Sequence, residues 1–156
     1  MKNSFHDHLK QFYESNKQGL FTYALSLTRN VSAAEDAVHT AFFGILKRPF
    51  LPRELRPCIF REIRNAAFDI KRKEALIDGI FVEADSDSSD PYSTRMLNQC
   101  LGQLPDEQRE IVVMKAIVGL TFSEISYLHR KSINTVTSSY RRAIEKMRSM
   151  IGENHD

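Results

Sequence analysis

The sequence contains little that would support covalent chemistry or membrane insertion. Its two cysteines are too few for a disulfide framework, and neither lies in a Cys-x-x-Cys or Cys/His spacing typical of zinc. The five histidines are scattered and the six glycines are isolated, so no catalytic histidine grouping or glycine-rich phosphate loop is present. No apolar run approaches the roughly 20 residues that span a bilayer, and no signal-peptide core is visible. We expect no enzyme activity, metal, cofactor or membrane insertion, and a cytoplasmic location.

Charge is distributed unevenly along the 156 residues, whose formal net charge is only +2. Residues 47–73 contain nine Lys or Arg and three acids, whereas residues 74–94 contain six acids and no Lys or Arg. A local basic segment can bind phosphate even when the total charge is close to zero. The hydrophobic content of 42% is typical of a soluble globular protein, and the length suits one compact domain or two small ones.

Two helix starts lie close together in the C-terminal third. Thr121 and Glu124 fit a capping box, and Ser132 is a second N-cap candidate. The segment between these helices, residues 129–131, is too hydrophilic to bury, so we expect the chain to turn there. Apolar residues after Ser132 recur at helical spacing and predict an inner face made of Val136, Tyr140, Ala143 and Met147. The pattern predicts a helix-turn-helix.

A helix-turn-helix suits DNA because an α-helix fits the major groove, where short polar side chains read base edges and nearby arginines bind phosphates. The helix N-terminus also attracts an anionic phosphate. The candidate DNA contacts are Ser132, Asn134, Thr135, Thr137, Ser138, Arg141 and Arg142. The alternative interpretation is an amphipathic helical hairpin with a solvated basic face.

Three helices are predicted in residues 1–73. The first carries an apolar stripe that Gly19 would weaken or break, and the second begins at a capping box formed by Ser32 and Glu35. Pro52 is expected in the first turn of the third helix. The inner face of that helix is predicted to contain Leu55, Ile59, Ile63, Ala66 and Ile70.

A second face of the third helix interleaves basic groups with an aromatic ring and an amide. Its members are Arg61, Arg64, Asn65, Phe68 and Arg72. Such a face suits a separated DNA strand, because cations follow the backbone, a ring stacks on a base and an amide reads a base edge. The alternative is an ordinary solvated helix face on which Phe68 packs against a neighbour.

Residues 74–94 break every periodic pattern and are rich in Ser and Asp, so they predict a flexible acidic linker between two helical modules. A short helix is expected over residues 95–102, and Pro105 begins the next helix, which Gly119 ends. That helix is predicted to supply the C-terminal core through Ile111, Val112, Met114, Ala116, Ile117 and Val118. The C-terminal domain is then a four-helix unit.

The segments LPDEQREIVVMKAIVGLTFSEI and INTVTSSYRRAIEKMR strongly resemble the C-terminal promoter-binding domain of bacterial sigma factors of the extracytoplasmic-function (ECF) type. AEDAVHTAFFGIL and IFREIRNAAFDIKRK resemble the other domain of those proteins. The resemblance therefore covers most of the chain, in the family's order. It implies an all-α protein with a minus-ten-binding domain over residues 1–73, a linker over 74–94 and a minus-thirty-five-binding domain over 95–156.

The resemblance also implies partners and roles. Core RNA polymerase and promoter DNA are the expected partners, and an anti-sigma factor is a further one that the family allows. The face of the second helix that resembles the family's polymerase-docking surface contains Glu35, Asp36, His39 and Thr40. Asn65 is implied as a base contact in the minus-ten strand, with Arg61, Arg64 and Arg72 on its backbone. The loop over residues 49–56 corresponds to a segment that helps to capture a flipped base.

The sequence departs from the family at three sites, one of which is Thr137 and Ser139 in place of a common Lys and Arg. His39 and Thr40 replace a common glutamine and acid, which makes the docking surface less acidic. At residues 129–131 the family usually has an aliphatic residue, a glycine and another aliphatic residue, whereas this chain has His, Arg and Lys. Two other functions remain open: a stand-alone helix-turn-helix regulator, and a sigma-mimicking protein that titrates an anti-sigma factor.

Overall fold

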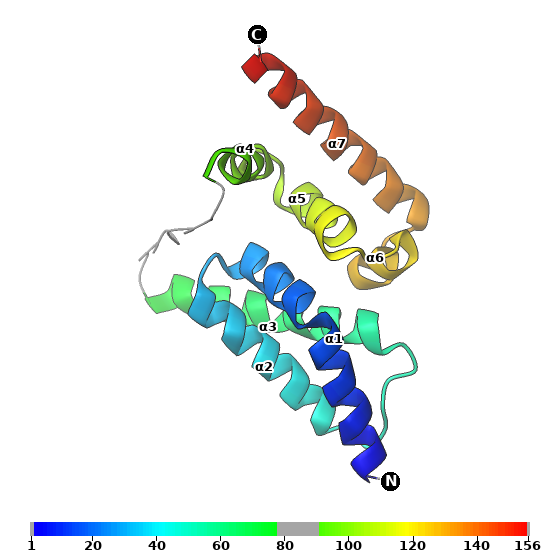
Figure 1. Ribbon diagram of the computed structural model, residues 1–156. Helices are drawn as coiled ribbons and strands as arrows, with labels where there is room; N and C mark the ends of the chain where they lie inside the picture. Colours follow the sequence, from blue (N-terminus) through cyan, green and yellow to red (C-terminus); the bar gives the residue numbers. More distant parts are fainter. Residues whose placement is uncertain (1, 78–90, 156) are drawn as a thin grey trace. The chain divides into compact units, whose positions relative to one another are not determined.

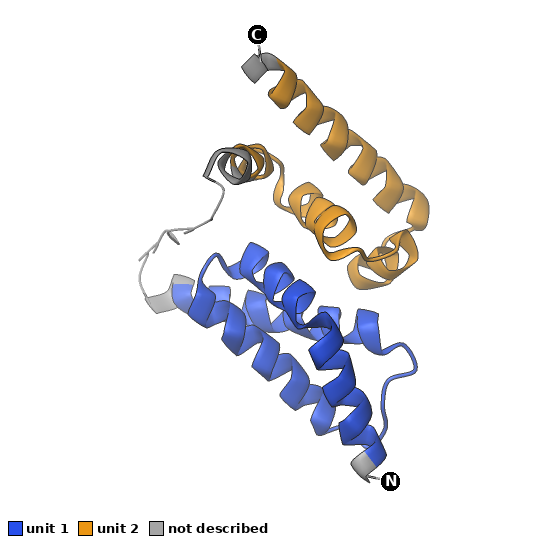
Figure 2. Cartoon of the chain, in the orientation of Figure 1, with its two compact units in different colours: residues 1–84 blue, residues 85–156 orange. Residues whose placement is uncertain are grey.

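The structure of the chain is a computed structural model that describes residues 2–77 and 91–155 (Figure 1). The described residues form helices and contain no β-strand. They separate into two compact units, residues 1–84 and residues 85–156 (Figure 2). The predicted fold class, an all-α protein with two small helical domains, is confirmed.

Helical structure extends further into the predicted linker than the sequence pattern indicates. Helix α3 continues to Ile77, and helix α4 begins at Pro91. Proline suits this first helical position because it lacks the N–H group that would have no partner there. The rest of the predicted acidic linker, residues 78–90, lies outside the described residues.

Unit 1 is a bundle of α1 (Lys2–Thr28), α2 (Val31–Leu46) and α3 (Leu55–Ile77), in which each helix packs against the other two. At its centre the rings of Tyr23 and Phe60 lie 5.4 Å apart, and both residues are buried. The other fully buried large side chains of this unit are Leu20, Ile45, Ile59 and Ile63. The predicted stripe of α3 therefore does face the core.

The predicted break at Gly19 is wrong. Helix α1 continues through this residue, and Leu20 and Tyr23 directly after it are completely buried. Glycine in a helix interior costs about 1 kcal/mol relative to alanine. Burying each of the large side chains that follow contributes about 1.5–3 kcal/mol, so the tertiary packing outweighs the local cost.

The predicted capping box at the start of α2 is also wrong. The N-cap is Asn30, whose side-chain oxygen accepts a hydrogen bond from the Ala33 N–H at 2.9 Å, and Ser32 lies within the helix. Asn30 has the extended backbone of an N-cap residue, and asparagine caps as well as serine does. Helix α1 ends at Thr28, and Arg29 after it has a positive φ of 55°, so the chain turns directly into the Asn30 cap.

The third helix begins after Pro52 rather than around it, because α3 starts at Leu55. Pro57 lies in the first turn, where a missing N–H breaks no intrahelical bond. The segment between α2 and α3 is anchored by Arg48, whose guanidinium contacts the Glu62 carboxylate at 2.8 Å and the Cys58 sulfur at 3.2 Å.

Unit 2 contains α4 (Pro91–Gly102), α5 (Asp106–Val112), the π-helical turn η1 (Val113–Val118), α6 (Phe122–His129) and α7 (Ile133–His155). Because η1 directly continues α5, these elements make the four helical segments that the sequence predicts. Helix α7 packs against α4, α5 and α6. The fully buried large side chains of this unit are Ile111, Met114, Leu120, Ile125 and Val136.

The prediction for the C-terminal end of this core stripe is wrong. Ile111, Val112 and Met114 are buried, but Ala116 is exposed, Val118 is only half-buried and Ile117 is 45% exposed. The π-helical turn bonds each residue to the fifth residue before it, so side chains after Met114 rotate away from the α-helical stripe. Gly119 then ends the segment with a φ of 87°, and Leu120 fills the core instead.

The N-cap of α2 can be tested by substitution. Asn30→Ala removes the side-chain oxygen that accepts the Ala33 N–H, so the free energy of unfolding of unit 1 should fall by about 1 kcal/mol. Ser32→Ala is the matched control and should change it by less than about 0.5 kcal/mol. Denaturant titration followed by circular dichroism measures both. A larger loss for the serine variant would restore the predicted capping box.

Candidate nucleic-acid interface

The helix-turn-helix of unit 2 has both predicted helix starts. Thr121 accepts the Glu124 N–H at 3.0 Å, and the Glu124 carboxylate accepts the Thr121 N–H at 2.9 Å, which completes the capping box of α6. Ser132 caps α7 by accepting the Thr135 N–H at 3.1 Å. Figure 1 shows the short α6 joined through a tight turn to the long α7.

The buried residues of α7 determine which of its side chains face outward. Val136 and Ala143 are completely buried and Met147 is 7% exposed. Tyr140 is half-buried, and its ring meets the edge of the Phe122 ring at 5.5 Å. These contacts hold α7 against α5 and α6, so the remaining side chains of its first turns face away from the unit.

The outward side chains of α7 divide into two groups. Asn134, Arg141 and Arg142 are exposed, and within the described residues their side chains make no hydrogen bond or ion pair. The hydroxyl groups are partly used locally: those of Ser132 and Thr135 lie 2.8 Å apart, and Thr137 donates to the Ile133 carbonyl at 2.7 Å. Ser138 is half-buried. The amide and the two guanidinium groups are therefore the groups best placed for an external ligand.

The predicted turn between α6 and α7 is present, but the prediction that residues 129–131 are too hydrophilic to bury is wrong for His129. The His129 side chain is only 2% exposed, and its Nε2 lies 3.7 Å from the carboxylate of Glu110, which is itself buried. Its Nδ1 lies 4.0 Å from the Glu107 carboxylate. Two carboxylates of α5 therefore lie close to the buried imidazole. Arg130 and Lys131 do remain exposed.

The two exposed cations of the turn have different surroundings. The Lys131 ammonium forms an ion pair with Glu107 of α5, so its charge is compensated. Arg130 has the left-handed backbone conformation, with φ 54° and ψ 40°, and its N–H donates to the Ser126 carbonyl to end α6. The sequence gives no sign of the Lys131 pairing, because its partner is 24 residues away.

The second face of α3 lies on the surface of unit 1. Asn65 and Arg72 are exposed, and Arg61, Arg64 and Phe68 are half-buried. The Arg64 guanidinium lies 4.6 Å from the centre of the Phe68 ring, a cation–π contact that orients both side chains. Arg72 forms an ion pair with Asp69 at 3.1 Å, and the negative charge of Asp69 weakens the attraction of Arg72 for a phosphate.

A third surface lies on α2, where Glu35, Asp36, His39 and Thr40 are all exposed; we call these four residues the α2 docking face. Phe43 follows His39 by one helical turn and is 63% exposed, with the Lys47 ammonium 5.4 Å from its ring centre. An exposed aromatic ring at this spacing extends the surface with an apolar element. The spacing is visible in the sequence and is the signal that identifies Phe43.

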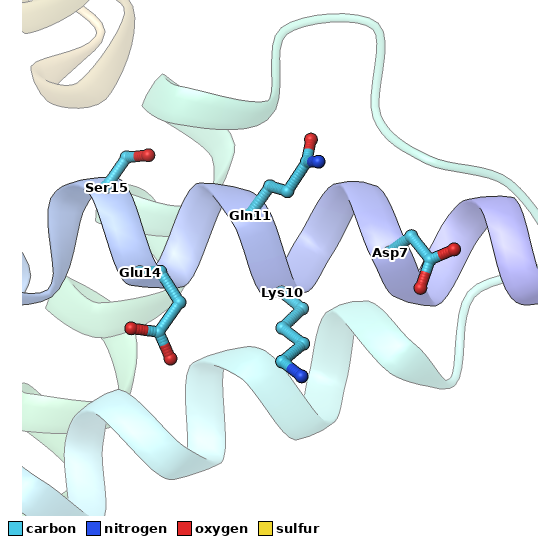
Figure 3. Close-up of a pocket in the computed structure, with 5 residues that line it drawn as sticks. All are labelled: Asp7, Lys10, Gln11, Glu14 and Ser15. Atoms are coloured by element: carbon cyan, nitrogen blue, oxygen red, sulfur yellow. The ribbon is translucent and has the colours of Figure 1, made fainter.

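A pocket on unit 1 is a weak candidate for a ligand site. All the residues that line it belong to α1 (Figure 3), and they are Asp7, Lys10, Gln11, Glu14 and Ser15. In Figure 3 their side chains project to both sides of the helix instead of converging on one point. In the part of the chain that the structure describes, no cluster of three metal-ligating side chains occurs and no helix could cross a membrane.

The helix-turn-helix and the outward arginines of α7 are features typical of helical DNA-binding proteins. Residues 94–147 match the family described as sigma-70, region 4. The RNA polymerase sigma factor CarQ of Myxococcus xanthus is 29% identical over 138 residues, which cover 81% of this chain and 79% of CarQ. The ECF RNA polymerase sigma factor SigM of Bacillus subtilis is 23% identical, over 91% of this chain and 94% of SigM.

The fold matches as well. The sigma factor RpoE of Bartonella quintana, solved in complex with the anti-sigma factor NepR, superimposes with a TM-score of 0.77 at 21% identity. The match covers 92% of this chain and 96% of RpoE. The chain is therefore similar to ECF sigma factors in sequence over most of its length, and to RpoE in fold.

The buried imidazole of the turn can be tested by its removal. His129→Ala leaves a cavity and takes a polar partner from the buried Glu110 carboxylate, so the free energy of unfolding of unit 2 should fall by about 2 kcal/mol. His39→Ala is the matched control, because His39 is exposed and its loss should cost less than about 0.5 kcal/mol. Denaturant titration measures both, and equal values would show that the His129 contacts contribute nothing.

Proposed function

We propose that this chain is a promoter-specificity subunit of bacterial RNA polymerase, which directs the enzyme to promoters and aids strand opening. The observation that carries the proposal is the helix-turn-helix with its outward Asn134, Arg141 and Arg142, within a segment that matches sigma-70, region 4. The chain has no chemistry of its own in this function. Because core polymerase and promoter DNA are its partners, it acts in the cytoplasm.

Helix α7 binds the duplex of the minus-thirty-five element. Asn134 is the candidate for reading a base edge, because an amide pairs with adenine through two hydrogen bonds and this one has no partner within the described residues. Arg141 and Arg142 bind backbone phosphates, with Thr135 and Ser138 beside them. Ser132 and Thr137 contribute mainly through the helix, because their hydroxyl groups bond to residues of α7.

Helix α3 binds the separated strand of the minus-ten element. Asn65 is exposed and reads a base, while Arg61 and Arg72 follow the strand backbone. The Phe68 ring is already in contact with the Arg64 guanidinium, which supports a base stacked on the remaining ring surface with the cation beside its phosphate. Each stacked base would contribute about 1–3 kcal/mol.

The α2 docking face binds core polymerase. Glu35 and Asp36 supply negative charge for a cationic partner surface. His39 and Thr40 carry no negative charge, so electrostatic attraction is weaker than an acid at either site would give. Exposed Phe43 offsets that loss, because burying an aromatic side chain in an interface contributes apolar contact area that salt does not screen.

An anti-sigma factor is a further proposed partner, since RpoE of B. quintana was solved in complex with the anti-sigma factor NepR. A chain that only titrated an anti-sigma factor would bind that partner without directing transcription. A stand-alone regulator would bind a symmetric half-site pair without polymerase. No described feature favours either alternative over a promoter-specificity subunit.

Reconstitution tests the proposed function directly. The purified chain with core polymerase should start transcription at a defined promoter selected from genomic fragments. Asn65→Ala should reduce strand opening, measured by a fluorescent base in the minus-ten element, by about tenfold while recruitment to duplex falls less than twofold. Gln18→Ala, an exposed substitution on α1, is the control. Failure of the chain to associate with core polymerase would favour the stand-alone regulator.

The roles on α7 can be separated by their dependence on sequence. Arg141→Ala should weaken binding to all promoters alike and lower the slope of log affinity against log salt by about 0.9, because one phosphate contact is lost. Asn134→Ala should instead change the preferred minus-thirty-five sequence, at a cost of about 1–3 kcal/mol for the best site. Binding selection from randomised duplexes measures both. Identical sequence profiles for the two variants would reject this division of roles.

A further inference from the structure

Arg130 is held in a conformation that its side chain disfavours. Among the described residues only Arg29 and Arg130 are non-glycine residues with a positive φ. A left-handed backbone places Cβ too close to the carbonyl oxygen, which is why glycine is the usual residue at such a helix end. The position ends α6, with the N–H groups of Arg130 and Lys131 both donating to the Ser126 carbonyl. Helix termination alone therefore favours glycine at residue 130.

No described residue of unit 2 compensates the charge of the Arg130 side chain. It is exposed, and it makes no hydrogen bond or ion pair within the described residues. The neighbouring Lys131 is paired with Glu107, and His129 is buried against Glu107 and Glu110. Arg130 is therefore the cation of this turn whose charge remains uncompensated, at a position where its backbone is strained.

Strained residues that the surrounding structure maintains are often found at functional sites. Arg130 lies two residues before Ser132, the N-cap of α7, and residues 130–135 are all exposed. When the first turns of a helix enter the major groove, the DNA backbone passes beside the helix N-terminus. A guanidinium there can donate two parallel hydrogen bonds to one phosphate.

We propose that Arg130 binds a backbone phosphate of the duplex beside the N-terminus of α7, an inference that rests on the proposed function. The contact does not read sequence; it fixes the position of α7 along the duplex. Lys131 contributes little to this contact, because Glu107 neutralises it. The conformational strain at residue 130 is tolerated in exchange for the phosphate contact.

Substitution by glycine separates the two effects, because it relieves the strain and removes the charge. Arg130→Gly should raise the unfolding midpoint of unit 2 by a few degrees and also weaken DNA binding. The chain is assembled with core polymerase, and the probe is a pool of random-sequence duplexes enriched by binding to the wild-type assembly. The ratio of wild-type to variant affinity should fall about three- to fourfold between roughly 50 and 200 mM salt, as the loss of one phosphate contact requires.

Two variants complete the test. Arg130→Lys keeps the charge and the strain, and should retain most of the wild-type salt dependence. Arg29→Gly is the matched control: Arg29 is also an exposed arginine at φ 55°, at the end of α1 in unit 1. It should raise the unfolding midpoint of unit 1 and leave the salt dependence unchanged.

The outcomes distinguish this inference from the proposed function. If the wild-type assembly enriches no duplex, the proposed function fails. If it does enrich duplexes, but Arg130→Gly binds them with wild-type affinity and salt dependence, the phosphate contact is refuted and Arg130 only ends α6. Equal losses for Arg130→Lys and Arg130→Gly would also refute it, because charge would then not be the cause.

Discussion

Burial of one apolar stripe on each of α3 and α7 is the constraint on which the candidate sites depend. Ile59 and Ile63 on α3, and Val136 and Ala143 on α7, are completely buried. Burial of each large apolar side chain contributes about 1.5–3 kcal/mol to the free energy of folding. An exposed ion pair such as that of Arg72 contributes about 1 kcal/mol or less. The stripes therefore set the rotation of both helices, and the outer residues contribute little to the burial of the core.

The turn of the helix-turn-helix is held by contacts of a different kind from those of the two apolar stripes. An apolar turn would pack into the core directly, but this chain has a histidine there, and the imidazole of His129 needs polar partners once it is buried. Helix α5 supplies the carboxylates of Glu107 and Glu110, and Glu107 also pairs with Lys131. The position of the turn relative to α5 consequently depends on polar contacts as well as on apolar packing. A polar network of this kind specifies one geometry more strictly than apolar contacts do. Loss of one side chain from it lowers the free energy of unfolding.

Under the proposed function, the two units bind different partners through different types of residue. Unit 1 combines an aromatic and amide face on α3 with the acidic α2 docking face and Phe43, whereas unit 2 presents Arg141 and Arg142 on the outer side of α7. A separated strand offers bases to stack on a ring, and an intact duplex offers only base edges and phosphates. The residue types on α3 and α7 fit this difference, so under the proposed function one chain would carry two unlike nucleic-acid surfaces despite a net charge of only +2.

Local signals in the sequence were sufficient for the helix-turn-helix, for both of its helix starts and for the exposed face of α2. A capping box needs only residues three apart, as at Thr121, and a helical period needs only one face to be apolar. Tertiary contacts decided the rest. The burial of His129 and the pairing of Lys131 depend on carboxylates about twenty residues away in the sequence, and Ile117 left the core because a π-helical turn rotated it outward. No local pattern in the sequence encodes contacts between residues so far apart. The sequence therefore predicted which residues face outward, but it could not predict which of their side chains already bind a neighbour in the folded chain.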